Sequence, residues 1–253
     1  MITFNEAQLL QWLSPLLWPF IRVLALFSTL PVFGQRMVAI RVRVGLAFFI
    51  ALCAQAGLPA MPVVQLDTPQ AFLLVIQQVL IGMSIGFAVR LVFAAVEFAG
   101  ELVGLQMGLN FAAFFDPISA TTATASSRFL GTLVAWLFIV INGHLLVIAA
   151  AVQSFQAFPV GPEPFAFLRA TQPHVWGAEV FRLGTWIALP MVAMLLFVNL
   201  LLGVISRVAP QMNVFSIGFP VTLGVGLIGM LLTLPMMQTP FMMALERMLS
   251  LFQ

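Results

Sequence analysis

Long apolar stretches follow one another along this chain, and short connections between them carry most of the polar residues. A helix needs about 20 apolar residues to cross a bilayer. Six stretches reach that length, at residues 9–32, 38–58, 71–100, 129–152, 175–208 and 214–234. A shorter amphipathic stretch, residues 240–252, follows them. The pattern predicts an all-α fold of about six hydrophobic helical segments.

Helix-breaking residues interrupt several of these stretches. Pro15 and Pro19 lie in the first, Pro190 in the fifth and Pro220 in the sixth. A proline removes one backbone hydrogen bond and kinks a helix. In lipid, broken backbone is tolerated only where protein or water satisfies it. We therefore expect kinked helices, packed as hairpins within a larger assembly.

The composition places these helices in a membrane. Of the 253 residues, 62% are hydrophobic and 7% are charged, whereas about a quarter of a soluble domain is charged. The chain is therefore predicted to be an integral membrane protein. All ten basic residues are arginines spread along the chain, which argues against a nucleic-acid-binding surface.

Charged residues lie in the second half of the third stretch and directly after it. At 100° per residue, Arg90, Glu97 and Glu101 fall on one helix face. A charge deep in a bilayer costs about 2.5–3.5 kcal/mol on insertion scales, so these groups must be paired, hydrated or outside the hydrocarbon. Two interpretations remain open. Arg90 pairs with Glu97 while Glu101 marks the membrane edge, or the face makes inter-subunit ion pairs or lines a pore.

A glycine-spaced, aromatic segment follows these charges. Gly100, Gly104 and Gly108 recur every fourth residue, which allows a neighbouring backbone to approach closely. Gly104, Gly108 and Pro117 allow the chain to turn sharply. Between these turns lies an apolar loop that contains Met107, Phe111, Phe114 and Phe115. Such a loop either packs against protein or forms a hydrophobic constriction, and the residues alone favour packing.

One catalytic motif occurs within the third stretch. The segment from Gly82 to Gly86 matches G-x-S-x-G, the nucleophile elbow of serine hydrolases, with Ser84 as the nucleophile. That motif requires a strand–turn–helix context, whereas here Gly82 and Gly86 indicate helix packing. His144, in an Asn-Gly-His interruption of the fourth stretch, and His174 are the only histidines. We expect no catalytic site, no metal site and no cofactor.

Three segments resemble a known family: GELVGLQMGLNFAAFFDP at 100–117, NGH at 142–144, and the run from ALP to GFP at 188–220. They are similar to the FliR/SctT family of type III secretion export-gate proteins, in its flagellar branch. The resemblance covers nearly the whole chain. It implies a single membrane domain, residues 1–253, that is similar to a FliP–FliQ fusion and contains a plug-like loop region at 104–127.

The resemblance also implies a function. Family members assemble with FliP and FliQ into a closed gate, and FlhB associates with that gate. Unfolded flagellar subunits cross the bacterial inner membrane through its centre, in the flagellar basal body. The implied plug residues are Met107, Phe111, Phe114 and Phe115. The implied subunit contacts are Arg90, Glu97, Glu101 and Arg207.

Two other functions are compatible with the residues alone. A small-solute secondary transporter would show repeat symmetry between its halves, and no convincing internal repeat is visible. An intramembrane serine protease would act through Ser84. The resemblance favours the non-enzymatic export gate over both.

Overall fold

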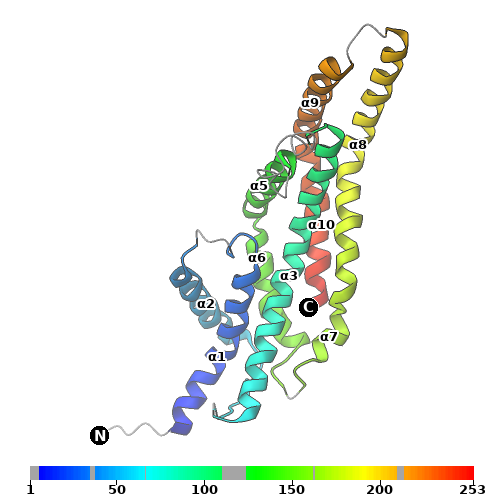
Figure 1. Ribbon diagram of the computed structural model, residues 1–253. Helices are drawn as coiled ribbons and strands as arrows, with labels where there is room; N and C mark the ends of the chain where they lie inside the picture. The colour runs from blue at the N-terminus through cyan, green and yellow to red at the C-terminus, as the bar shows by residue number, and fades with distance from the viewer. Residues whose placement is uncertain (1–5, 35–37, 66, 110–123, 162, 210–213) are drawn as a thin grey trace. The chain divides into compact units, whose positions relative to one another are not determined.

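The computed structural model describes residues 6–34, 38–65, 67–109, 124–161, 163–209 and 214–253. All regular secondary structure within these ranges is helical (Figure 1). The helices are α1 (Glu6–Thr29), α2 (Ile40–Ala54), α3 (Pro69–Gln106), α5 (Ala125–Val140), α6 (Gly143–Ala157), α7 (Ala166–Thr171), α8 (Trp176–Val208), α9 (Val214–Thr233) and α10 (Gln238–Leu249). The predicted all-α class is confirmed.

Among the described residues, four helical stretches are long and apolar enough to cross a membrane. They are Ile40–Gly57, Pro69–Gln106, Ala166–Val208 and Ser216–Phe252. The bent pair α5 and α6 provides a fifth if it counts as one span. The first predicted stretch is helical, but its apolar part, Leu13–Thr29, is shorter than the other spans. The prediction of a multi-pass membrane protein therefore agrees with the observed helices.

The fourth predicted stretch differs from expectation. It is divided at Asn142, which adopts a left-handed conformation with φ 57° and ψ 29°. Asparagine tolerates this conformation better than most residues, so the Asn-Gly-His segment ends one helix and begins another. By contrast, Pro190 and Pro220 lie inside α8 and α9 without ending them.

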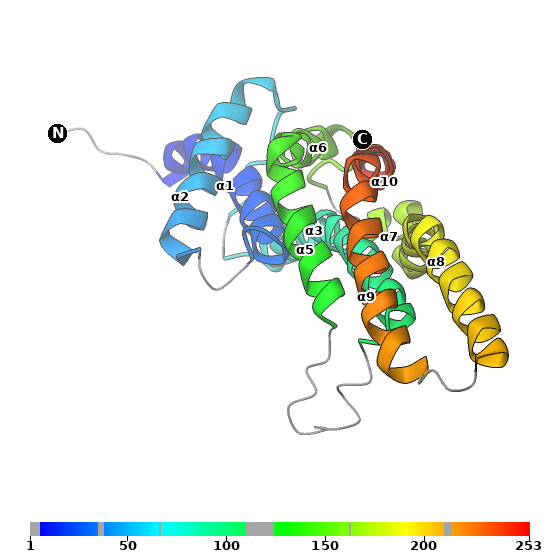
Figure 2. The ribbon, with the colours of Figure 1, turned by 90° about the horizontal axis from the view of Figure 1, so that it is seen from above.

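The chain divides into two compact units, and α3 contributes to both. The first unit contains residues 1–91, 139–176 and 245–253. Within it, α2 packs against α1 (Figures 1 and 2). Its fully buried side chains include Trp18, Phe27 and Phe155. Trp176 and Phe252 stack edge to face, with ring centroids 5.7 Å apart.

The second unit contains residues 92–138 and 177–244. In this unit, Phe93 of α3 pairs edge to face with Phe138 of α5 and with Phe241 of α10, with ring centroids 5.4 and 5.6 Å apart. Edge-to-face aromatic pairs of this kind add about 0.5–1.5 kcal/mol beyond area burial. One aromatic cluster thus joins three helices of this unit.

In the first unit, small residues let α3 approach α1 closely. A Cβ added at Gly82 would collide with the backbone carbonyl oxygen of Arg22, and one at Gly86 would collide with the hydroxyl of Thr29. The Thr29 hydroxyl also lies 3.4 Å from the carbonyl oxygen of Met83. Close backbone approach of this kind is characteristic of helix packing in membranes.

We predict that Gly82→Ala destabilises the protein by about 1–3 kcal/mol, because the new methyl group meets backbone that can move only with α1. The matched control is Gly203→Ala in α8, where an added Cβ meets nothing within 4 Å. That substitution should leave stability unchanged or raise it by up to about 1 kcal/mol. Unfolding in detergent measures both, and equal stability of the two variants would contradict the predicted packing.

Candidate functional site

Helix α3 ends at Gln106 and is followed by a C-terminal capping motif. We call the segment between residues 109 and 124 the central loop. Gly108 has φ 79°, a conformation that glycine adopts without strain. The amide of Leu109 donates to the carbonyl of Gly104 at 3.0 Å, and the amide of Gly108 donates to that of Leu105 at 3.1 Å. These two bonds form a Schellman motif. The chain therefore leaves α3 in a fixed direction.

The chain returns to α3 at the first turn of α5. The Thr124 hydroxyl accepts a hydrogen bond from the Ser127 amide at 3.2 Å, the arrangement of a helix N-cap. The Thr124 amide donates to a carboxylate oxygen of Glu101 at 2.9 Å. A carboxylate beside a helix N-terminus is also favoured by the helix dipole. Glu101 thus ties the start of α5 to α3.

Hydroxyl groups continue this contact along both helices. Ser126 donates to the carbonyl of Gly100 at 2.8 Å, and Ser127 donates to that of Glu97 at 2.9 Å. A Cβ at Gly100 would lie 2.6 Å from the Cα of Ser127, so only glycine permits this spacing. The contact holds residues 109 and 124, the two ends of the central loop, on one structural base. We call the contact between residues 97–109 and 124–131 the loop base.

The predicted fourth stretch begins at residue 129, whereas α5 begins earlier, at Ala125. Residues 125–127 already belong to α5, and the side chains of Ser126 and Ser127 are buried. Small hydroxyl side chains look linker-like in sequence. In this setting they satisfy backbone carbonyls where another helix comes too close for larger residues.

Met107, the first of the predicted plug residues, lies at the loop base with a fully buried side chain. A Cβ at Gly226 of α9 would lie 2.6 Å from Met107 Cγ. The Thr222 hydroxyl donates to the Met107 carbonyl at 3.4 Å. Helix α9 therefore covers the point at which the loop leaves α3. The other predicted residues, Phe111, Phe114, Phe115 and Pro117, lie outside the described residues.

The predicted contact residues are distributed along the chain. Glu97 is exposed, and its side chain lies beside Gly131 of α5, whereas Glu101 is half-buried at the loop base. Arg207 is exposed in the last turn of α8. Arg90 is exposed in the part of α3 that belongs to the first unit. The structure therefore brings Glu97, Glu101, Gly100 and Gly104 together, and the Arg90–Glu97 pair stays a prediction.

The hydrolase-like segment lies within one continuous helix. Ser84 is near the middle of α3, and Gly82 and Gly86 face α1. The strand–turn–helix context that a nucleophile elbow requires is therefore replaced by a helix. Within the described part of the chain, no group of three or more His, Cys, Asp or Glu residues could hold a metal ion.

A buried arginine in the first unit is a feature that our sequence analysis missed. Arg22 of α1 has no exposed surface. Its guanidinium donates two hydrogen bonds to Gln78 Oε1, at 2.8 and 2.6 Å, and one to Ser154 Oγ at 2.8 Å. Another goes to the Phe158 carbonyl at 2.9 Å, and the group lies 3.5 Å from the Phe155 ring centroid. These described partners are all neutral.

The network extends through Gln77 to the connection after α6. Gln78 donates to Gln77 at 2.9 Å, and Gln77 donates to the carbonyl of Glu163 at 3.3 Å. Arg22 is the only charged residue in the first apolar stretch, and an intramembrane charge marks a site by default. Applied to Arg22 as it was to Arg90, that rule would have marked Arg22 as a candidate site, although not its partners.

The chain as a whole was compared with known families and proteins. A family model described as "Bacterial export proteins, family 1" matches residues 13–248. The chain is 42% identical over 239 residues to the flagellar biosynthetic protein FliR of Pectobacterium carotovorum subsp. carotovorum, covering 93% of this chain and 90% of that protein. It is 42% identical over 246 residues to FliR of Escherichia coli (strain K12), covering 95% and 92%. It is 32% identical over 216 residues to FliR of Bacillus subtilis (strain 168), covering 83% and 82%.

We expect Glu101→Leu to lower the free energy of unfolding by about 1–3 kcal/mol, because the Thr124 amide then loses its acceptor. Glu101→Gln keeps an acceptor oxygen and should lose less. Glu246→Leu, at an exposed position of α10, is the control for the charge change. If Glu101→Leu is no less stable than Glu246→Leu, Glu101 does not hold the loop base.

For the arginine network, we expect Gln78→Leu to cost about 1–3 kcal/mol, because it removes the principal acceptor of a buried cation. Gln78→Glu retains acceptor oxygens and should recover most of that loss. Gln70→Leu, at an exposed position of the same helix, should change stability by no more than about 0.5 kcal/mol. Thermal unfolding in detergent ranks the three variants, and similar midpoints for Gln78→Leu and Gln70→Leu would refute a stabilising role.

Proposed function

Because this chain belongs to the family of bacterial export proteins, family 1, we propose that it is a core subunit of the flagellar type III export gate. The chain is a non-enzymatic, membrane-embedded component of flagellar protein export. In the proposed gate, FliP and FliQ homologues complete a closed channel and an FlhB homologue associates with it. Unfolded flagellar subunits would cross the inner membrane through this channel.

The observation that carries this proposal is the extent of the match. Identity of 42% extends over 95% of the chain, so it includes the helices of both units and the segments on either side of the central loop. A match confined to apolar helices would support only membrane insertion. A match of this length also spans the segments that contain the loop base and the Arg22 network.

Exposed side chains are consistent with a chain completed by partner subunits. On α8, Trp186 is 68% exposed and Phe197 is 62% exposed. Exposed apolar surface of a membrane protein can face lipid or protein, but the exposed charge of Arg90 on α3 is costly in lipid. We propose that Arg90, Glu97, Glu101 and Arg207 contact partner subunits, with Glu101 also holding α5 within this chain.

The proposed seal is the plug-like loop region, residues 104–127, of a single gate domain that spans residues 1–253. Met107, Phe111, Phe114 and Phe115 would form a hydrophobic constriction, and Gly104, Gly108 and Pro117 would allow its turns. An apolar constriction excludes ions by dewetting. Its contacts with a passing chain depend little on sequence. The fixed loop base supports this assignment, because a seal needs a rigid mounting.

Assembly provides the direct test of the gate. Co-expression of this chain with FliP-like and FliQ-like proteins should yield one stable complex. The chain purified without them should aggregate or fail to fold stably. A stable monomer that transports a small solute in proteoliposomes would overturn the proposal. Omission of each partner in turn identifies which one the chain requires.

Replacing Phe111, Phe114 and Phe115 together with alanine should make the assembled gate leak ions. Loss of the large apolar rings lets water enter the constriction, and a barrier lowered by about 1.4 kcal/mol already raises flux tenfold. Ion flux into vesicles that contain the purified complex measures this effect. Phe165→Ala, at a 53% exposed position before α7, is the control. An ion-tight triple variant would rule out these rings as the seal.

A further inference from the structure

The residue that directly follows α3 is held by a second helix. Met107 has no exposed surface, and its side chain lies across Gly226 of α9. A Cβ added at Gly226 would lie 2.6, 2.7 and 2.8 Å from the Cγ, Sδ and terminal methyl group of Met107. Three atoms of one side chain thus occupy the space that any residue larger than glycine needs at position 226. We call the packing of Met107 on Gly226 and Thr222 the α9 contact.

The backbone of Met107 takes part in the same contact. The last carbonyl groups of a helix lack helical donors, and the Thr222 hydroxyl lies 3.4 Å from the Met107 carbonyl oxygen. This buried hydroxyl also lies 3.0 and 3.1 Å from two carbonyl oxygens of its own helix, those of Gly218 and Phe219. The long bond to Met107 is therefore the weaker part of the contact, and the packing on Gly226 is the stronger part.

The α9 contact acts on the same turn that the loop base holds from α5. Gly104, three residues before Met107, faces α5, and a Cβ added there would collide with the hydroxyl of Ser126. Residues three apart are neighbours on a helix surface. The chain then leaves through Gly108, which has a left-handed backbone. Two helices, α5 and α9, therefore hold the turn from which the central loop starts.

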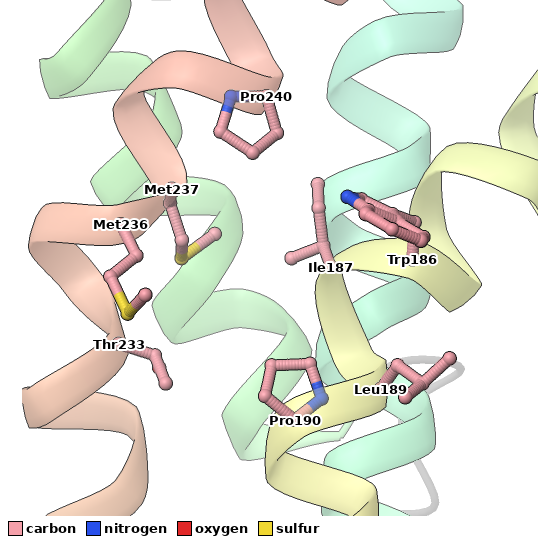
Figure 3. A pocket seen from close by; sticks show the side chains of 8 residues that line it. All are labelled: Trp186, Ile187, Leu189, Pro190, Thr233, Met236, Met237 and Pro240. Atoms are coloured by element: carbon pink, nitrogen blue, oxygen red, sulfur yellow. The ribbon is translucent and has the colours of Figure 1, made fainter.

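Another methionine of the second unit is placed differently. Met236 lies in the 3-10 turn Leu234–Met237, which joins α9 to α10. It lines an apolar groove together with Trp186 and Pro190 of α8 (Figure 3). Its side chain is 72% exposed, and a flexible methionine can change its conformation at such a site at little cost. Met107 is fully buried, so its conformation is set by its neighbours.

We propose that Gly226 and Thr222 are positioning residues of the export gate, because they hold Met107 and so set where the central loop begins relative to α9. This role rests on the export-gate function proposed above, in which the central loop contributes the seal. A hydrophobic constriction excludes water only while its apolar groups lie close together. Displacement of Met107 would move the first residues of the loop and open the seal to ions.

A double-mutant cycle tests the contact itself. Relative to Gly224→Ala, Gly226→Ala should lower the melting midpoint in detergent by at least about 2 °C, because the new methyl group displaces Met107. Gly224→Ala is the matched control on α9, since it gains the same helix propensity and its Cβ meets nothing within 4 Å. Met107→Ala removes the colliding atoms, so Gly226→Ala should have little effect in that background. Equal shifts in the two backgrounds would overturn the contact.

Ion flux tests whether the contact positions the seal. In vesicles that contain the assembled complex, Gly226→Ala should raise ion flux about tenfold over Gly224→Ala, at a temperature well below both melting midpoints. A purely structural role predicts no leak from a complex that stays folded and assembled. Thr222→Val keeps the side-chain shape without the hydroxyl and should have a smaller effect. Met236→Ala, at the exposed groove, should leave flux unchanged.

The outcomes separate this proposal from the proposed function. An ion-tight Gly226→Ala complex would overturn the positioning role and leave the export gate intact. Failure of the native chain to assemble with FliP-like and FliQ-like proteins would overturn the export gate, and the positioning role with it. The melting experiment uses the full chain with whichever partners accompany it during purification, so its result does not depend on export.

Discussion

The close contact between α3 and α5 is the constraint on which the central part of this chain depends. At Gly100 the two backbones approach so closely that the hydroxyls of Ser126 and Ser127 reach carbonyl oxygens of α3. Buried polar groups in a membrane protein must find partners within the protein. The small hydroxyl side chains donate hydrogen bonds to these carbonyl oxygens, and their size also lets the two helices lie close together. Together with the bond from the Thr124 amide to Glu101, these contacts fix residues 109 and 124 relative to each other.

In the first unit, one large polar side chain, Arg22, joins several helical elements through buried hydrogen bonds. Arg22 reaches α3, α6 and the segment after α6 from a single position on α1. Burying an unpaired cation is costly, but neutral acceptors and an aromatic face surround its guanidinium. A planar group with five donors can join several elements at once. Shape and hydrogen bonding, rather than an ion pair, therefore define this junction.

The sequence predicts the helices well because a bilayer imposes a minimum apolar length and leaves few alternatives to helix. The glycine spacing predicts close helix packing at Gly82, Gly86 and Gly100, but the sequence does not predict which helix lies there. Arg22 and Ser154 are 132 positions apart, and nothing local to either residue indicates the other. The start of α5 was missed because serine and threonine are common in connections. The break at Asn142 was visible as a polar interruption, but its left-handed backbone was not.

The proposed export gate must seal a membrane and also allow an unfolded chain to pass, and these tasks require different mechanical properties. The loop base is stiff because hydrogen bonds and close backbone contact fix it on two sides. Regular α-helical bonding is interrupted at the turn Leu234–Met237 and at Pro190. Helix α9 connects the loop base to this turn, since it contacts Met107 through Gly226 and ends where the turn begins. In the proposed gate, the loop base would keep both ends of the sealing segment in place whether the channel is closed or open.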